Sequence, residues 1–185
     1  LIGALAGDAL TTSNNNLAIG YKALSADTAG TKTTAIGFEA LMSQNFTSNT
    51  DSYNVAVGYT AGREITTGIQ NTAVGALSLD ANTTGNENTA VGYSALSTAT
   101  TAGGNTAMGW GAMISTTTGY ANVAIGVSAL GVQTTGNQNV AVGSLTLDAL
   151  TTGTFNVAVG QAAGGAVTTG VQNTLIGGLA GDALT

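Results

Sequence analysis

The stretch NTAVGYSAL, from Asn88 to Leu96, decides the fold because variants of it recur along the whole chain. Its glycine returns at intervals of 17 residues, except that Gly37 and Gly58 are 21 residues apart. A fixed period of this kind indicates one small structural unit repeated in tandem. Eleven glycines mark the units: Gly3, Gly20, Gly37, Gly58, Gly75, Gly92, Gly109, Gly126, Gly143, Gly160 and Gly177.

The composition of the unit favours β-structure over helix. Asparagine, glycine and paired threonines at fixed places disfavour a helix, whereas β-branched residues favour strands. In each unit an extended phrase such as Asn88–Tyr93 is followed by a shorter one such as Ser94–Leu96. A Thr-Thr-Gly phrase, as at Thr83–Gly85, supplies a turn whose glycine can adopt a positive φ. The sequence therefore predicts an all-β fold, a parallel β-solenoid or β-roll with 17-residue coils.

Stacking at about 4.8 Å per coil places equivalent residues above one another in columns, so the whole array extends roughly 50 Å. The alternation of side chains along a strand puts Val91 on the opposite face from Ala90. We expect the Val, Ile and Met column that contains Val91 to be the buried stripe, joined by a Leu and Met column. These residues are Ile2, Ile19, Ile36, Val57, Val74, Val91, Met108, Ile125, Val142, Val159 and Ile176, with Leu24, Leu41, Leu96, Met113 and Leu130.

An asparagine precedes the strand in most units, and we expect it to form a ladder of side-chain amides at a corner. An amide there can bond its neighbours above and below as well as the local backbone. Thr33 interrupts this column just before the irregular unit. The structural ladder comprises Asn16, Asn54, Asn71, Asn88, Asn105, Asn122, Asn139, Asn156 and Asn173, with the motif glycines Gly58, Gly75, Gly92, Gly109, Gly126, Gly143 and Gly160.

The alanine column includes Ala73, Ala90 and Ala107. Together with the motif glycines, it forms a strand face on which the side chains are very small or absent. One interpretation is a very flat coil whose opposite walls approach closely. The other is a seam against a second chain, where small residues allow two backbones to come close. We favour the seam, because it better explains the persistence of small residues along the array.

Composition limits the functions that the chain can perform. It has 185 residues and a formal net charge of −6, with Lys22, Lys32 and Arg63 as its only cations. The absence of histidine and cysteine removes the usual general base, the thiol nucleophile, the common zinc ligands and disulfides. Nucleic-acid binding needs clustered Lys and Arg, and a membrane helix needs about 18 apolar residues. We therefore expect no enzymatic activity, no cofactor, no nucleic-acid partner and no membrane insertion in this segment.

The four-residue insertion, within an irregular unit spanning residues 42–53, is the best candidate for a ligand contact. We expect it to expose Phe46 and Tyr53 as aromatic residues beside Asn45 and Asp51, on a loop held by rigid neighbours. Such a loop suits contact with a carbohydrate or a receptor. The alternative is a tolerated bulge on a regular rod, with no ligand.

Three further columns have competing interpretations. The aromatic residues after the motif glycine, such as Tyr21 and Trp110, suit packing between coils better than a sugar-stacking stripe. The column of Asp8, Asp80, Asp148 and Asp182 consists of scattered single carboxylates, so we expect no metal site. The Thr-Thr column raises ice binding as a minor alternative function. Consecutive threonines on a strand point to opposite sides, however, so the spacing does not predict a flat array.

Three phrases, NTAVGYSAL at 88–96, NTAVGALSL at 71–79 and NVAIGVSAL at 122–130, carry a resemblance to known repeats. They resemble the short repeats of trimeric autotransporter adhesin heads and similar repeats of bacteriophage tail fibres. The adhesin-head unit is shorter, and the Thr-Thr-Gly turn is an addition here. The resemblance implies a left-handed parallel β-roll in which three identical chains form one rod, located extracellularly, at a cell surface or in a virion fibre.

The first and last units are nearly the same, since LIGALAGDAL at 1–10 matches LIGGLAGDAL at 175–184 in all but one residue. We therefore expect one continuous repeat array over 1–185 that is a fragment of a longer fibre. The predicted function is a structural and adhesive shaft that mediates or presents attachment to a host or surface. The alternative is a cell-surface adhesin head whose own side binds glycan or matrix.

Overall fold

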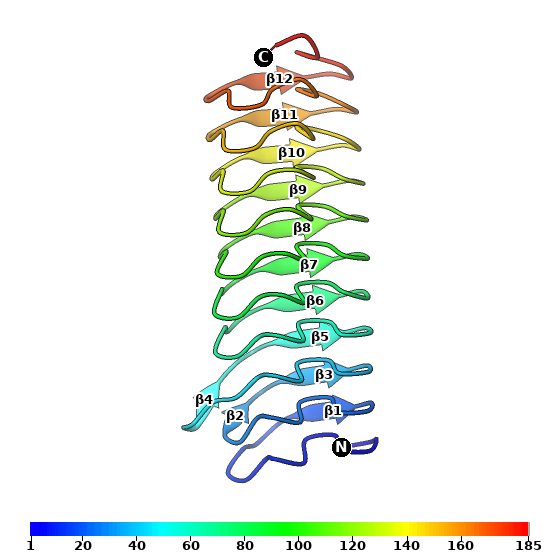
Figure 1. The fold of residues 1–185 in the computed structure, drawn as a ribbon, viewed down its shortest axis with the longest axis vertical. Coiled ribbons are helices and arrows are strands. Elements are labelled where there is room, and N and C mark those ends of the chain that lie inside the picture. The colour runs from blue at the N-terminus through cyan, green and yellow to red at the C-terminus, as the bar shows by residue number, and fades with distance from the viewer. Residues whose placement is uncertain (185) are drawn as a thin grey trace.

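In the computed structural model, which describes residues 1–184, the chain winds into a rod of stacked coils (Figure 1). Strands, turns and bends make up the described residues, which contain no helix. From residue 17 onward each coil contributes one short strand to the main sheet, and all strands of this sheet run in the same direction. The protein is therefore an all-β parallel solenoid, as its sequence predicts.

Ten strands form the main sheet in sequence order, with β2 and β4 set aside as a separate pair. An isolated bridge from Ile2 to Ile19 adds one more coil below β1. The two strands of the small sheet are β2 (Gly30–Thr31) and β4 (Thr50–Asp51). The main sheet consists of β1 (Leu17–Ile19), β3 (Thr34–Ile36), β5 (Val55–Val57), β6 (Thr72–Val74), β7 (Thr89–Val91), β8 (Thr106–Met108), β9 (Val123–Ile125), β10 (Val140–Val142), β11 (Val157–Val159) and β12 (Thr174–Ile176).

The register places like residues opposite like residues, as the 17-residue period requires. Ala73 of β6 pairs with Ala90 of β7, and Val74 pairs with Val91. Backbone hydrogen bonds continue beyond the strands, where the amide of Gly92 donates to the carbonyl of Val74 at 2.8 Å. Because every coil repeats this ladder, each described coil is tied to its neighbours along its whole path.

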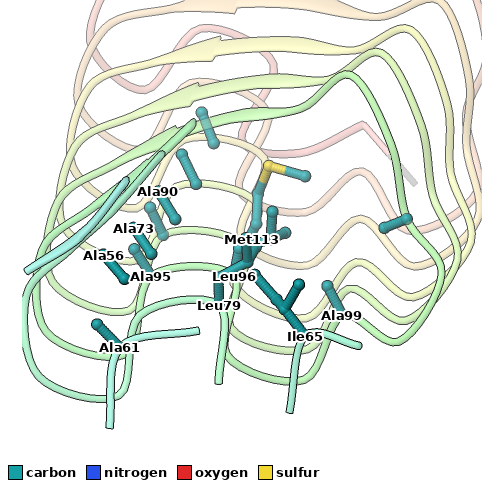
Figure 2. Packing of buried hydrophobic residues seen from close by; sticks show 14 of the residues in the cluster. Ala56, Ala61, Ile65, Ala73, Leu79, Ala90, Ala95, Leu96, Ala99 and Met113 are labelled. Carbon is teal, nitrogen blue, oxygen red and sulfur yellow. The ribbon is translucent and has the colours of Figure 1, made fainter. Parts of the chain in front are cut away.

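The interior is lined by alanine from the strand and by leucine or methionine from the opposite wall (Figure 2). Ala90, Ala95 and Leu96 are fully buried, and their equivalents in most other coils are buried too. The predicted burial of the leucine and methionine column is thus confirmed. Small residues are needed on one wall because the two walls lie close together, which leaves a thin but closely packed core.

Two predictions about the strand faces were wrong. The Val, Ile and Met column lies on the outer face: Val91 is half-buried and Met108 is 39 % exposed. The alanine column cannot be a seam against a second chain, because its own coil covers it completely. The flat-coil interpretation is the correct one. Alternation along a strand defined the two faces, but the closing of the coil chose which one turned inward.

The glycine of the Thr-Thr-Gly phrase also differs from expectation. Gly119 does not adopt a positive φ. Glycine is needed at this position because there is no space for a side chain: a Cβ atom would lie 2.5 Å from the carbonyl oxygen of Gly136 in the next coil. The turn is therefore made by two threonine bends, and the glycine allows the next coil to approach.

Leucines of the inner wall adopt a backbone conformation that is uncommon for them. Leu79, Leu96 and Leu130 have φ values of 53°, 54° and 52°, in the left-handed region. That region costs about 1–2 kcal/mol for an L-residue. Full burial of a leucine side chain contributes about 1.5–3 kcal/mol, which offsets this cost. The inner wall can thus turn sharply and still fill the core.

In some coils the leucine column of the inner wall holds glycine instead, and a larger residue three positions later fills the space. Gly62 is followed by the buried Ile65, whereas Leu96 is followed by Ala99. A Cβ atom on Gly62 would lie 3.0 Å from Ile65 Cδ1 and 3.0 Å from Leu41 Cδ2. In other coils both positions are large, as for Leu147 with Leu150 and for Leu130 with Gln133. At least one of the two columns thus supplies a Leu, Ile, Val or Met side chain in each coil.

This compensation predicts strong coupling between positions 62 and 65. Gly62→Leu should lower the free energy of unfolding by about 1–3 kcal/mol through overpacking. Ile65→Ala should lower it by about 2–5 kcal/mol through a cavity. The double variant recreates the Leu96 and Ala99 pair, so its loss should fall below the sum by at least about 1 kcal/mol. Urea denaturation of the four proteins measures this; additive losses would contradict volume exchange.

Candidate functional site

The insertion lies at the corner of the rod where β4 projects beyond the regular coils (Figure 1). Gly30 pairs with Thr50 across β2 and β4, while Thr34 pairs with Val55 across β3 and β5. Three of the four extra residues are therefore absorbed before β4, where positions 47–49 are exposed, and the fourth lies between β4 and β5. The regular register resumes at the next strand, so the insertion leaves the main sheet undisturbed.

Phe46 does not belong to an exposed site, contrary to the expectation. It is 7 % exposed. A Cβ atom added to Gly30 would lie 2.9 Å from its ring, so the ring packs over that glycine. The backbone amide of Phe46 donates to Asp27 Oδ1 at 3.1 Å. The ring thus closes the interior of the irregular coil, since burial of a large aromatic surface is favourable there.

Tyr53 and Asp51 do lie together on the surface, and Lys32 joins them. Lys32 Nζ lies 2.6 Å from Asp51 Oδ2, donates to Tyr53 Oη at 3.0 Å, and sits 5.0 Å from the ring centroid of Tyr53. The hydrogen bond to Asp51, followed by that to Tyr53, raises the pKa of Lys32. The hydrogen bond from Lys32, then that from Thr31, lowers the pKa of Asp51. Lys32 was not among the residues predicted from the sequence, although it occupies the same column as Tyr53 one coil earlier.

Asn45 lies apart from this exposed cluster and serves the stacking of coils. Its backbone amide donates to the carbonyl of Thr66 at 3.0 Å. Its side-chain Oδ1 accepts a hydrogen bond from Thr28 Oγ1 at 3.3 Å. Of the four residues proposed from sequence, only Asp51 and Tyr53 therefore form one surface.

Beneath the insertion lies a buried polar network that the sequence analysis did not identify. Asp27 accepts hydrogen bonds from the amides of Gly30 and Phe46 and from Gln44 Nε2, at 3.0, 3.1 and 2.8 Å. Gln44 Oε1 accepts from Asn54 Nδ2 at 2.8 Å. The signal in the sequence was weak, because Asp27 and Gln44 occupy a column that holds apolar residues such as Ile65 in some coils and polar residues such as Gln133 in others.

The network replaces one step of the asparagine ladder. In a regular coil, such as that of Asn105, the side chain donates Nδ2 to the amide oxygen of Asn88 below and to the Gly119 carbonyl in its own coil. Its own Oδ1 accepts the backbone amide of Asn122 above. Below Asn54 stands Thr33, which has no amide oxygen, and Gln44 provides one instead. The predicted ladder is confirmed, and its one interruption is satisfied from a different column.

The aromatic column is confirmed as packing between coils. Tyr21 and Phe38 stack with ring centroids 5.4 Å apart, and Phe38 and Tyr59 stack at 5.2 Å. A second group follows, in which Tyr93 and Trp110 stack at 6.4 Å. These rings are partly exposed, but each stacked neighbour covers a face on which a sugar would stack.

The paired threonines contribute mainly to stacking. The hydroxyl of Thr83 donates to the carbonyl of Thr100 in the next coil at 3.0 Å, and Thr66 donates likewise to Thr83. The second threonine of each pair, such as Thr84, is exposed. One hydroxyl per coil is therefore presented, which does not favour the two-column array that ice binding would use.

Over residues 1–184, no group of three or more acidic residues is placed to hold a metal ion. The same residues include no helix with the length and apolar character needed to cross a bilayer.

The fold defines the chain as a parallel β-solenoid built from 17-residue β-roll coils. No model of a known protein family matches the chain, and neither does any curated protein or any solved structure.

Proposed function

We propose that the chain is a structural and adhesive shaft of an extracellular fibre, located at a cell surface or in a virion, and that it assembles as a homotrimer. The observation that carries this proposal is the unbroken stacking along the rod. Main-chain hydrogen bonds and the asparagine ladder connect consecutive coils on several sides. Such repeated cross-linking gives a stiff rod, which suits holding a contact surface away from its support.

The outer face of the main sheet is the surface that we assign to self-association. Val57, Val74 and Val91 lie there half-buried, and the aromatic column runs beside them. The outward columns of this face contain no charged residue over the ten strands. An uncharged and largely apolar surface of this kind, here with threonine as its polar residue on the strands, marks interaction sites. A second copy suits it best, because identical coil spacing lets equivalent positions match along the whole length. The number three and the left-handed winding follow from the resemblance and stay predictions.

Molecular mass in solution tests this assembly. At micromolar concentration we expect the mass of a trimer by analytical ultracentrifugation. The double variant Val91→Asp and Val142→Asp should reduce it to that of a monomer, because association would bury unpaired charges. The matched control, Thr84→Asp with Thr135→Asp, places the same charges on an exposed corner and should leave the trimer intact. A monomeric wild-type protein would contradict self-association.

The exposed cluster of Lys32, Asp51 and Tyr53 favours a second candidate function, that of an adhesin whose side binds glycan or matrix. Tyr53 is 50 % exposed and is held by Lys32 and Asp51. Loss of glycan-array binding on Tyr53→Ala would support this function. Phe46→Ala is not a useful test of it, because Phe46 is buried and its loss would disturb packing.

A further inference from the structure

A groove of about 490 Å³ crosses three successive coils on one corner of the rod. Its floor is Gly103 and Gly104, and its walls include Asn86 and Glu87 from the preceding coil and Tyr120 from the following one. In the lower coils of Figure 1, β2 and β4 mark the same corner. This groove is separate from the insertion cluster and plays no part in the proposed assembly face.

The two glycines that form the floor are not required by the fold. Gly104 has a φ of 65°, and Glu87 and Ala121 adopt nearly the same value, 60° and 55°, in the same column. A Cβ atom on Gly104 would have no neighbour closer than 3.9 Å, and one on Gly103 would lie 3.3 Å from the Asn86 carbonyl oxygen. Side chains fill these two columns in the neighbouring coils, so their absence here is what opens the groove. Glycine at an open position suits close approach of a ligand to the backbone.

The side chains around the floor offer a ring, an acceptor and a donor. Tyr120 is 52 % exposed, and Glu87 presents an exposed carboxylate. The Oδ1 atom of Asn86 accepts the backbone amide of Ile69 at 2.8 Å, which orients the amide group and leaves its NH₂ as a donor. Exposed hydroxyls of Thr101 and Thr118 line the same groove. An aromatic face with a few fixed polar groups is the general pattern of a small-molecule site.

The charge of the groove limits the class of ligand that it can bind. Glu87 gives the groove a negative charge, and the cations Lys22, Lys32 and Arg63 all lie in earlier coils. An anionic sugar or a phosphate would meet repulsion without a compensating partner. A ring with an apolar face and several hydroxyls would stack on Tyr120 and bond the carboxylate, the amide and the threonines.

We propose that this groove binds a neutral or amino-substituted saccharide of one or two sugar residues. The binding surface goes beyond the mechanical role of the shaft and does not depend on the assembly of three chains. Contact with a sugar at one point of the shaft adds a specific attachment site to an otherwise repetitive surface.

Saturation-transfer NMR on the assembled protein tests this site with named probes. These are the methyl glycosides of glucose, galactose, N-acetylglucosamine and glucosamine, with 3′-sialyllactose as the anionic comparison. We expect transfer to at least one of the four methyl glycosides and none to sialyllactose. Gly104→Gln should weaken binding at least tenfold by filling the groove, and Tyr120→Ala should do so by removing the ring. Gln70 and Gln138 occupy the position equivalent to Gly104, so Gly104→Gln should fold normally.

Tyr93→Ala is the matched control, because Tyr93 is equally exposed but lies outside the groove. It should leave binding unchanged. The proposal is overturned by absence of transfer to all four methyl glycosides, by a preference for sialyllactose, or by binding that survives Gly104→Gln and Tyr120→Ala. Loss of binding on Tyr93→Ala alone would also overturn it and move the site to the stacked aromatic column. A trimer that binds none of the probes would leave the shaft function intact.

Discussion

Asn105→Leu is expected to lower the free energy of unfolding by about 3–6 kcal/mol, because it leaves several buried polar groups without partners. Asn105 Oδ1 accepts the backbone amide of Asn122 at 2.9 Å and its side-chain Nδ2 at 3.2 Å. Asn105 Nδ2 donates to the Gly119 carbonyl at 2.9 Å and to Asn88 Oδ1 at 3.2 Å. Leucine has similar volume but none of these groups. Each buried donor or acceptor left unpaired costs about 1–3 kcal/mol.

Asn105→Asp tests the hydrogen bonds separately from shape, because aspartate keeps the shape of asparagine but replaces the NH₂ donor with an oxygen. The carboxylate can accept the Asn122 amide, but its second oxygen would face the carbonyl of Gly119, and a negative charge would be buried. We expect a loss at least as large as that of Asn105→Leu near neutral pH. The control is Asn49→Leu on the exposed insertion, with an expected change within about 0.5 kcal/mol. Chemical denaturation measures all three; a loss below about 1 kcal/mol for Asn105→Leu would contradict a stabilising ladder.

Gly92→Ala is expected to have an effect of similar size, for a purely steric reason. Gly92 has a φ of 133°, a conformation that residues with a side chain rarely adopt. A Cβ atom there would lie 2.5 Å from the carbonyl oxygen of Gly109 and 2.7 Å from its carbonyl carbon. Both are backbone atoms of the next coil, so a side-chain rotation cannot relieve the contact. Backbone strain of about 1–3 kcal/mol and overpacking of about 1–3 kcal/mol together predict a loss of about 2–6 kcal/mol.

Gly104→Ala provides the matched control, since it is the same substitution at another position of the same coil. Its φ of 65° is one that alanine tolerates at the equivalent Ala121, and no neighbour lies within 3.9 Å of the added atom. We expect a change within about 1 kcal/mol. Amide hydrogen exchange should show faster opening of the coils around Gly92 in the Gly92→Ala protein. Equal stability of Gly92→Ala and Gly104→Ala would contradict this prediction, because it would mean that the coils move apart to fit the added Cβ atom at no cost in free energy.

At the insertion, the structure differs from what the sequence predicts. Tyr53 and Phe46 are both aromatic residues on a polar stretch, so the residues alone predicted that both were exposed. Phe46 is buried because Gly30 of the preceding coil leaves space for its ring. Gly30 is close in space but 16 residues away in sequence, and only the stacking of the irregular coil brings the two together. The pairing of Lys32 with Tyr53 likewise depends on one coil lying directly above another.

The sequence by itself determined the period, the strand character, the stacking of equivalent residues and the asparagine ladder. These follow from repetition, because any contact made between two coils is made again between the next two. Only the tertiary structure decided that Ala90 faces inward and Val91 outward. Alternation gives a strand two faces without saying which is inside. The answer depends on how closely the opposite wall, with Ala95 and Leu96, approaches when the coil closes, and that narrow spacing admits alanine.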